Sequence, residues 1–209
     1  MNSYMQSLVN QHRQHPGDYI LGMLIRDHAD ELTNEELVGI GNILLVAGHE
    51  TTANTIGLGT LLLLQHPDQL ALVRDDPEMI TGAVEEMLRY LSIVHTGTPR
   101  IIMQDMIIGG QQLRAGDVAM VSLPSANRDS DFMTDPDIFD VTRQPQAHLT
   151  FGHGIHQCLG QQLARLEMSV ALPALLQRFP TLSLAASPAD LTFRGDGPVN
   201  GVQQLPVRW

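Results

Sequence analysis

The longest continuous pattern in the chain is an apolar stretch without proline from about residue 34 to about residue 65. Directly before it, Thr33 and Glu36 have the spacing of a capping box, in which each side chain accepts a hydrogen bond from the backbone N–H of the other residue. Together these signals predict a helix of roughly 30 residues, about 45 Å long.

Shorter helices are predicted on both sides of this stretch. The first fifteen residues are typical of the end of a helix, and residues 18–28 of another short one. Pro67 suits the first turn of a further helix, because proline lacks the N–H that the first turn leaves unpaired. Asp76 and Pro77 repeat this signal, as N-cap and first helical residue of a helix that extends to about residue 91.

After Pro99 the pattern changes to short apolar runs that are separated by turn residues. Residues 129–150 are rich in proline and aspartate and predict an ordered irregular loop, and residues 181–209 predict more short strands. The fold class is therefore mainly α with a minor β part. The strands predicted before the loop are residues 100–104, 106–108, 111–113 and 118–121.

The composition is that of an ordinary globular protein, with 209 residues, 43% of them hydrophobic and 17% charged. A net charge of −11 argues against nucleic-acid binding and against a basic membrane-binding surface. The sequence shows no signal peptide and no stretch apolar enough to span a membrane. These features predict a soluble, cytoplasmic protein.

The chain has one cysteine, Cys158, in a glycine-rich segment. A lone cysteine can be an inert core residue, a nucleophile or a metal ligand. Gly152, Gly154 and Gly160 let the backbone turn tightly and approach a flat, bulky partner. Residues 159–179 predict a helix, which Pro173 should kink or split. Cys158 then lies near a helix N-terminus, where a buried thiolate would be stabilised and would suit an axial iron ligand.

Residues 151–160 read Phe-Gly-His-Gly-Ile-His-Gln-Cys-Leu-Gly and resemble the haem-ligand signature of the cytochrome P450 family, Phe-Gly-x-Gly-x-His-x-Cys-x-Gly. The resemblance implies haem b with Cys158 as its axial ligand, His156 as a donor to a haem propionate and His153 as a contact on the same side. Two alternatives stay open: a buried structural cysteine, and a zinc site of His153, His156 and Cys158. The residues implied to bind the cofactor here are Phe151, Gly152, His153, His156, Cys158 and Gly160.

A second group of polar residues lies within the long predicted helix, in the run Ala-Gly-His-Glu-Thr-Thr of residues 47–52. An acid and an alcohol are unfavourable in so apolar an element unless they find partners. They either form a solvated stripe with threonine hydroxyls bonded to the preceding turn, or mark an opening of the helix at Gly48 that faces a cavity. The run resembles the family's oxygen-activation motif, which implies that Glu50 and Thr51 deliver protons and that Ala47 and Gly48 lie over the haem.

Two further motifs follow in the family's order. Glu86 and Arg89 resemble its Glu-x-x-Arg pair, which implies a buried, structural brace with Arg143 as the candidate third member, although this spacing usually marks a weak surface pair. Arg100, after Pro99, is alone most often a surface arginine. In this context it resembles the family's propionate-binding arginine, and a guanidinium fits a carboxylate well.

The resemblance covers residues 1–209, which correspond to a single partial domain, the C-terminal half of the cytochrome P450 fold without its N-terminal half. It implies a long central helix, the Glu-x-x-Arg helix, short β-sheets, and the cysteine loop with its following helix. It also implies a monooxygenase that inserts one atom of O2 into a hydrophobic small molecule, with electrons from NAD(P)H through ferredoxin reductase and ferredoxin. The alternatives are an inactive remnant without haem, or a zinc-binding module.

Few residues are expected to face the substrate. They are small or apolar, with His95 as the exception, and they allow a polyketide, terpenoid or macrolide without choosing among them. They lie in residues 43–46, 93–98 and 195–199.

Overall fold

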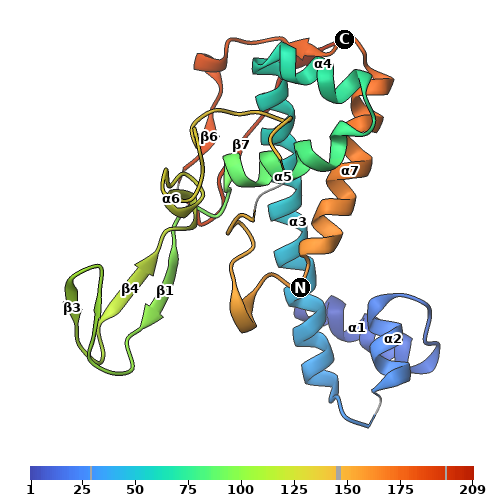
Figure 1. Ribbon diagram of the computed structural model, residues 1–209. Helices are drawn as coiled ribbons and strands as arrows, with labels where there is room; N and C mark the ends of the chain where they lie inside the picture. Colours follow the sequence, from blue (N-terminus) through green and yellow to red (C-terminus); the bar gives the residue numbers. More distant parts are fainter. Residues whose placement is uncertain (29, 145–146, 196) are drawn as a thin grey trace. The chain divides into compact units, whose positions relative to one another are not determined.

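The structure, a computed structural model, describes residues 1–28, 30–144, 147–195 and 197–209 (Figure 1). The chain divides into two compact units, Met1–Glu50 and Thr51–Trp209. The boundary between them falls within the long helix α3 (Asn34–Gln65).

The first unit consists of α1 (Asn2–Gln14), α2 (Ile20–Asp27) and the first part of α3. Its small core is formed by the buried side chains of Val9, Ile25 and Leu37. The predicted capping box is confirmed, because Thr33 N donates to Glu36 Oε2 at 2.8 Å and Glu36 N donates to Thr33 Oγ1 at 3.2 Å. The capping box thus fixes the start of α3.

Helix α3 has 32 residues and confirms the prediction of a long helix over residues 34–65. The expected opening at Gly48 is not found, since α-helix continues through this residue. Thr55 Oγ1 donates to the carbonyl oxygen of Thr51 at 2.8 Å, the back-bonding to the preceding turn that is common for threonine in helices. A helix can therefore hold this polar run without a break.

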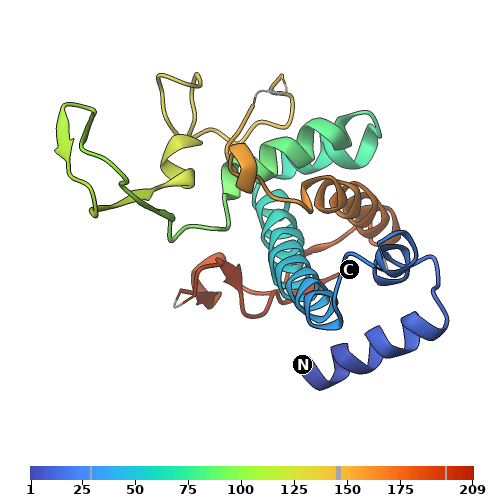
Figure 2. The ribbon, with the colours of Figure 1, turned by 90° about the horizontal axis from the view of Figure 1, so that it is seen from below.

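The second unit is built around three further helices, α4 (Pro67–Asp75), α5 (Met79–Leu91) and α7 (Gln161–Arg178). Figures 1 and 2 show α5 and α7 side by side. The main core lies among these helices and the last turns of α3. Helices α3, α5 and α7 contribute its fully buried side chains Leu63, Val84, Met87, Met168 and Leu172.

Two expectations about proline are corrected. Helix α5 begins at Met79 rather than at Pro77. Asp76 Oδ1 accepts a hydrogen bond from Glu78 N at 3.0 Å in the turn that precedes the helix. Helix α7 is not split at Pro173, which lies inside one continuous helix. Met168 and Leu172 before this proline and Leu176 after it are buried, so that packing holds the helix together there.

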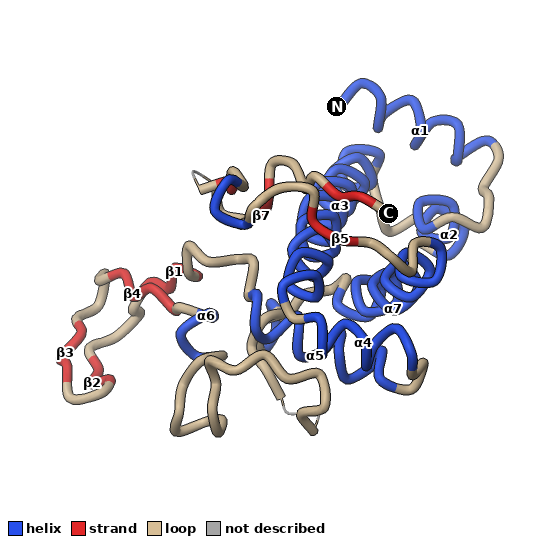
Figure 3. Tube along the Cα trace, turned by 90° about the horizontal axis from the view of Figure 1, so that it is seen from above, coloured by secondary structure: helices blue, strands red, loops and turns tan. Residues whose placement is uncertain are grey.

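The β part of this unit forms an arm of two antiparallel pairs that projects from the helices (Figures 1 and 3). Strand β1 (Thr98–Ile101) pairs with β4 (Val118–Val121), and β2 (Met106–Ile108) with β3 (Gln111–Leu113). Three of the four predicted strands are confirmed, whereas the first lies at 98–101 rather than 100–104. A short helix that follows, α6 (Leu123–Ala126), was not predicted.

The C-terminal segment confirms the prediction of short strands. Strand β5 (Ser183–Leu184) pairs with β8 (Val207–Arg208), and β6 (Phe193–Arg194) with β7 (Gly201–Val202). They cover a second core cluster of Leu58, Leu61 and Ile93. Of the helices in the described part of the chain, none combines the length and the apolar character that a membrane span requires.

Candidate functional site

The cysteine segment is an ordered loop that leads into α7. The amide of Cys158 donates to the carbonyl oxygen of Phe151 at 2.9 Å, across a single 3-10 turn (Gly154–His156). Gly152 and Gly154 have φ angles of +71° and +85°, a conformation that side chains other than glycine rarely adopt. Gly160 is the N-cap of α7 (Gln161–Arg178), so that Cys158 lies two residues before the N-cap, near the helix N-terminus.

The surface around Cys158 is open and apolar. Cys158 itself is exposed, which excludes the buried structural cysteine and corrects the expectation of a buried thiolate. Ile155 and Leu159 are 97% and 87% exposed. A Cβ atom added at Gly152, Gly154 or Gly160 would meet no atom within 4 Å. The loop therefore presents a sulfur donor on a face with room for a large apolar partner.

The geometry does not support the zinc alternative. His153 and His156 are exposed on the same loop as Cys158. Nowhere in residues 1–28, 30–144, 147–195 and 197–209 do three His, Cys, Asp or Glu side chains come together in a way that could hold a metal ion. The loop thus offers one thiol ligand rather than a closed site of several side chains, as a structural zinc ion requires.

Glu86 and Arg89 form a buried ion pair in α5, with side chains 4% and 2% exposed. Arg89 Nε donates to Glu86 Oε2 at 2.7 Å, and Arg89 Nη2 donates to Glu86 Oε1 at 2.8 Å. The same guanidinium donates to three backbone carbonyls of the loop after α6, those of Asn127, Pro136 and Ile138, at 2.8–3.2 Å. The pair thereby ties the irregular loop to α5.

The structure places Arg143 beside this pair. Its Nε lies 3.5 Å from Glu86 Oε1, as an ion pair without hydrogen-bond geometry. Its other nitrogens donate to the carbonyls of Thr134, Asp135 and Ile138. Three charged groups from two segments therefore share one contact region.

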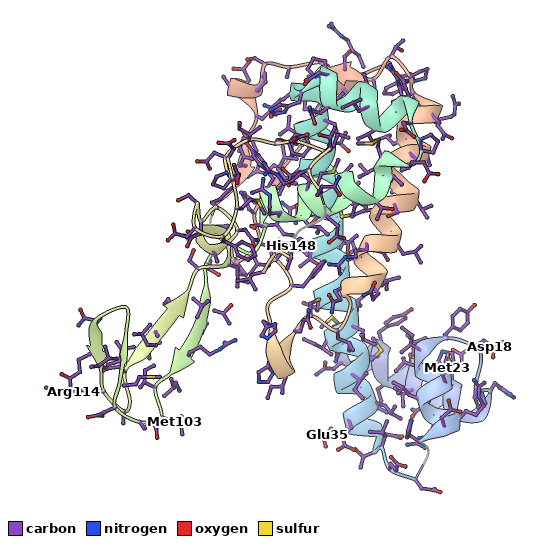
Figure 4. The ribbon with its side chains drawn as sticks, viewed as in Figure 1. Asp18, Met23, Glu35, Met103, Arg114 and His148 are labelled. Atoms are coloured by element: carbon purple, nitrogen blue, oxygen red, sulfur yellow. The ribbon has the colours of Figure 1, made fainter. Side chains whose placement is uncertain are left out.

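A second carboxylate next to this brace was missed by sequence reasoning. Glu85 Oε1 accepts from Arg165 Nε at 2.6 Å, and Glu85 Oε2 accepts from Arg165 Nη2 at 3.1 Å. Glu85 Oε2 also lies 3.1 Å from His148 Nε2. His148 is labelled in Figure 4. Burial alone would raise the pKa of Glu85, but the hydrogen bonds from His148 and Arg165 outweigh it and lower the pKa to about 2.

Asn127, which also went unpredicted, is fully buried and anchors the chain just before the cysteine loop. Its Nδ2 donates to Ser92 Oγ at 2.8 Å and to Thr150 Oγ1 at 2.9 Å, and its Oδ1 accepts from Leu149 N at 2.7 Å. Partners 22 to 35 residues away leave no local pattern in a single sequence, so no spacing rule could have found this residue.

The polar run of α3 is divided between the two units. Ala47, Gly48 and Glu50 are exposed in the first unit, and the half-buried Thr51 opens the second. Cys158 belongs to the second unit.

The predicted propionate ligand Arg100 is exposed on β1, opposite Ala119 of β4, and donates to the carbonyl of Pro99 at 3.0 Å. Among the described residues, no hydrogen bond or ion pair joins Arg100 to the cysteine loop.

The segments expected to face a substrate differ in their surroundings. Ile43, Leu45 and Val46 are exposed, each by about half or more. Ile93 is buried in the second core cluster instead, so the expectation for this residue is wrong. A β-bridge between Val94 and Val199 brings two of the segments together. Residue 196 of the third segment and residues 145–146 of the predicted loop lie outside the described residues.

Comparison with known proteins places these observations in a family. The sequence model described as "Cytochrome P450" matches residues 2–76 and 78–189. Cytochrome P450 105C1 of a Streptomyces species is 52% identical over 210 residues, which cover 100% of this chain and 55% of the relative. The chain thus spans about half the length of the curated relatives it matches.

Solved structures agree. The complex of Streptomyces peucetius CYP105P2 with a biphenyl compound has a TM-score of 0.95 at 46% identity, over 100% of this chain and 53% of that one. The hydroxylase MycCI of Micromonospora griseorubida, bound to mycinamicin VIII, has a TM-score of 0.94 at 41% identity, over 100% and 54%. The predicted fold class is therefore confirmed.

Proposed function

Because this chain belongs to the cytochrome P450 family, whose members bind haem through a cysteine thiolate, we propose that it supplies the haem-ligand half of a monooxygenase. The reaction inserts one oxygen atom of O2 into a C–H or C=C bond of a hydrophobic small molecule. The other atom leaves as water, with two electrons and two protons supplied from outside.

The residues present fit a haem group. A flat, largely apolar macrocycle needs a face without protruding side chains, and the three glycines of the loop leave such a face open. The exposed apolar side chains of Ile155 and Leu159 flank the only thiol of the chain. When bound, a thiolate-ligated haem supplies the electron density at iron that favours O–O cleavage.

The loop residues have separate proposed roles. Cys158 provides the thiolate, and its place just before α7 stabilises negative charge on sulfur through the helix N-terminus. His156 and Arg100 would hold the two propionates, since a cationic or N–H donor pairs well with a carboxylate. Phe151, Gly152, His153 and Gly160 shape the loop around the sulfur.

The α3 run would handle protons. In the proposed role, the Glu50 carboxylate and the Thr51 hydroxyl pass protons from solvent toward the oxygen that is being reduced. Ala47 and Gly48 keep the helix surface small at this place, because neither has a side chain beyond Cβ. The exposed position of Glu50 supports proton exchange with water.

The substrate is proposed to be a hydrophobic natural product, such as a macrolide or another polyketide. The exposed apolar side chains of Ile43, Leu45 and Val46 support this class, as does the mycinamicin VIII bound to MycCI. Electrons are proposed to come from NAD(P)H through ferredoxin reductase and ferredoxin, and the protein is expected in the cytoplasm.

The observation that carries the proposal is the exposed Cys158 on its glycine-rich loop before α7. The test uses the full-length product of the gene, reduced and exposed to carbon monoxide. We expect the red-shifted Soret band of thiolate ligation, its loss in Cys158→Ala, and its retention in Met103→Ala, a matched loss of an exposed sulfur. A folded protein that binds no haem, or an unchanged band in Cys158→Ala, would overturn the proposal.

A further inference from the structure

One carboxylate contacts the chain on both sides of the cysteine loop. Glu85 hydrogen-bonds His148, ten residues before Cys158, and Arg165, seven residues after it. These partners are 63 and 80 residues from Glu85 in the sequence, so the contacts fix three separate segments against each other. The segment 148–165 is thereby closed into a loop whose two ends meet at Glu85 in α5.

Both carboxylate oxygens of Glu85 accept hydrogen bonds. Arg165 makes a bidentate pair with both carboxylate oxygens, at 2.6 and 3.1 Å. Thr150 N donates to His148 Nδ1 at 3.3 Å, so that this nitrogen is the acceptor and the proton of a neutral ring lies on Nε2. His148 Nε2 then donates to Glu85 Oε2. The His148 side chain is 2% exposed, so its ring is shielded from water.

The same cluster contacts the first residue of the cysteine loop. The Arg165 guanidinium lies 4.6 Å from the centre of the Phe151 ring, and the His148 ring centre lies 5.9 Å from it. Phe151 in turn accepts the backbone hydrogen bond from Cys158 N. A continuous chain of contacts therefore leads from Glu85 through Arg165 and Phe151 to the backbone of Cys158.

This cluster is distinct from the neighbouring brace. Glu86 contacts Arg89, Arg143 and the amide of Asp140, all outside the segment 148–165. In the part of the chain that the structure describes, the side-chain hydrogen bonds and ion pairs of Glu85 go to that segment. Two adjacent carboxylates on α5 thus hold two different parts of the chain.

We propose that Glu85 is a positioning residue for the thiolate, which clamps the two ends of the Cys158 loop through His148 and Arg165 and so sets the direction of the Cys158 backbone. The proposal rests on the proposed haem function. Groups that orient metal ligands from outside the coordination sphere commonly change metal affinity about 10- to 100-fold when they are replaced.

The decisive variant is Glu85→Gln. The amide keeps the shape of the side chain but replaces one acceptor oxygen by an N–H donor, which must face the donors of Arg165 or His148. Asp75→Asn is the matched control, because Arg74 contacts Asp75 with the same bidentate geometry, at 2.7 and 2.9 Å, on the exposed surface of α4. Arg165→Lys keeps the charge and removes the fork, and we expect an intermediate effect.

Two measurements on the full-length gene product test the clamp. The first is hydrogen–deuterium exchange of haem-free protein in peptides that cover residues 148–165, with α4 peptides as internal reference. The second is the haem affinity and the fraction of thiolate-type Soret band with carbon monoxide, at a temperature where circular dichroism shows the variant folded. For Glu85→Gln we expect faster exchange in 148–165 only, about 10- to 100-fold weaker haem binding and a smaller thiolate fraction.

Each outcome decides the proposal. Unchanged exchange in 148–165 would overturn it, because the ends of the loop would then not depend on Glu85. Faster exchange with wild-type haem affinity and thiolate fraction would also overturn it, because the role would be structural alone. If Glu85→Gln does not fold, Arg165→Lys decides by the same two measurements. Absence of the thiolate band in the wild-type protein refutes the haem function itself, and it is recognised without any variant.

Discussion

Replacing Arg89 by methionine should destabilise the fold more than removing the charge of Arg74 or Glu85. Arg89 is 2% exposed and donates five hydrogen bonds, two to Glu86 and one each to the carbonyls of Asn127, Pro136 and Ile138. Methionine fills a similar length of side chain but donates none. The change therefore isolates the loss of charge and hydrogen bonds from a loss of packing.

The magnitude follows from what the variant leaves behind. Among the described residues, the carboxylate of Glu86, 4% exposed, then keeps the amide of Asp140 at 3.1 Å and the ion pair with Arg143 at 3.5 Å. Removing one partner of a buried pair typically lowers the free energy of unfolding by about 3–5 kcal/mol. Lysine at this position retains the charge but cannot make the parallel pair of bonds, and we expect a loss of about 1–3 kcal/mol.

Urea denaturation of the full-length gene product, followed by circular dichroism, measures both losses. Arg74→Met is the matched control, because Arg74 forms a bidentate pair with Asp75 on the exposed surface of α4, and it should leave the free energy of unfolding unchanged. A loss below about 1 kcal/mol for Arg89→Met would refute the reasoning, since the buried brace would then contribute no more than an ordinary hydrogen bond.

Three further predictions concern stability. The pKa of Glu85 is about 2 in the folded protein against an ordinary value of 4.5, so its contribution to the free energy of unfolding is complete above pH 4.5 and is lost as the pH falls toward about 2. Denaturation at several pH values should therefore show that the stability of Glu85→Gln depends less steeply on pH in acid than that of the wild type. An equal dependence would contradict the lowered pKa of Glu85. Leu172→Ala, at a fully buried position, should lower the free energy of unfolding by about 2–5 kcal/mol, whereas the exposed Glu167→Ala on the same helix should change it little. Thr33→Ala should lower the stability of the first unit by about 1 kcal/mol through loss of its N-cap, which exchange of the first α3 amides would report; unchanged protection would argue against the capping box.

Elements whose signals are local were predictable from the sequence. The capping box of Thr33 and Glu36 fixes the start of α3 through bonds three residues apart, and the turn at Gly109–Gly110, with φ angles of +55° and +80°, separates β2 from β3. The cysteine loop was found for the same reason, because its ten residues form one contiguous motif. In each case the residues that determine the structure are neighbours in the chain.

Features that depend on distant partners were missed or misjudged. The contacts of Glu85 and Asn127 join segments more than twenty residues apart, and a single sequence carries no pattern for them. Pro173 was expected to kink or split α7, but the helix is not split, because the burial of Met168 and Leu172 outweighs one missing hydrogen bond. The opening expected at Gly48 followed from polar residues in an apolar helix, but the helix passes through this residue and Thr55 bonds back to the carbonyl of Thr51.

The central claim is a bond between the sulfur of Cys158 and haem iron. Iron-edge X-ray absorption fine structure of the haem-loaded, full-length gene product measures the nearest neighbours of iron directly. The account predicts one sulfur neighbour in the wild-type protein and none in Cys158→Ser. A folded, haem-loaded wild-type protein whose iron has only nitrogen and oxygen neighbours would contradict it.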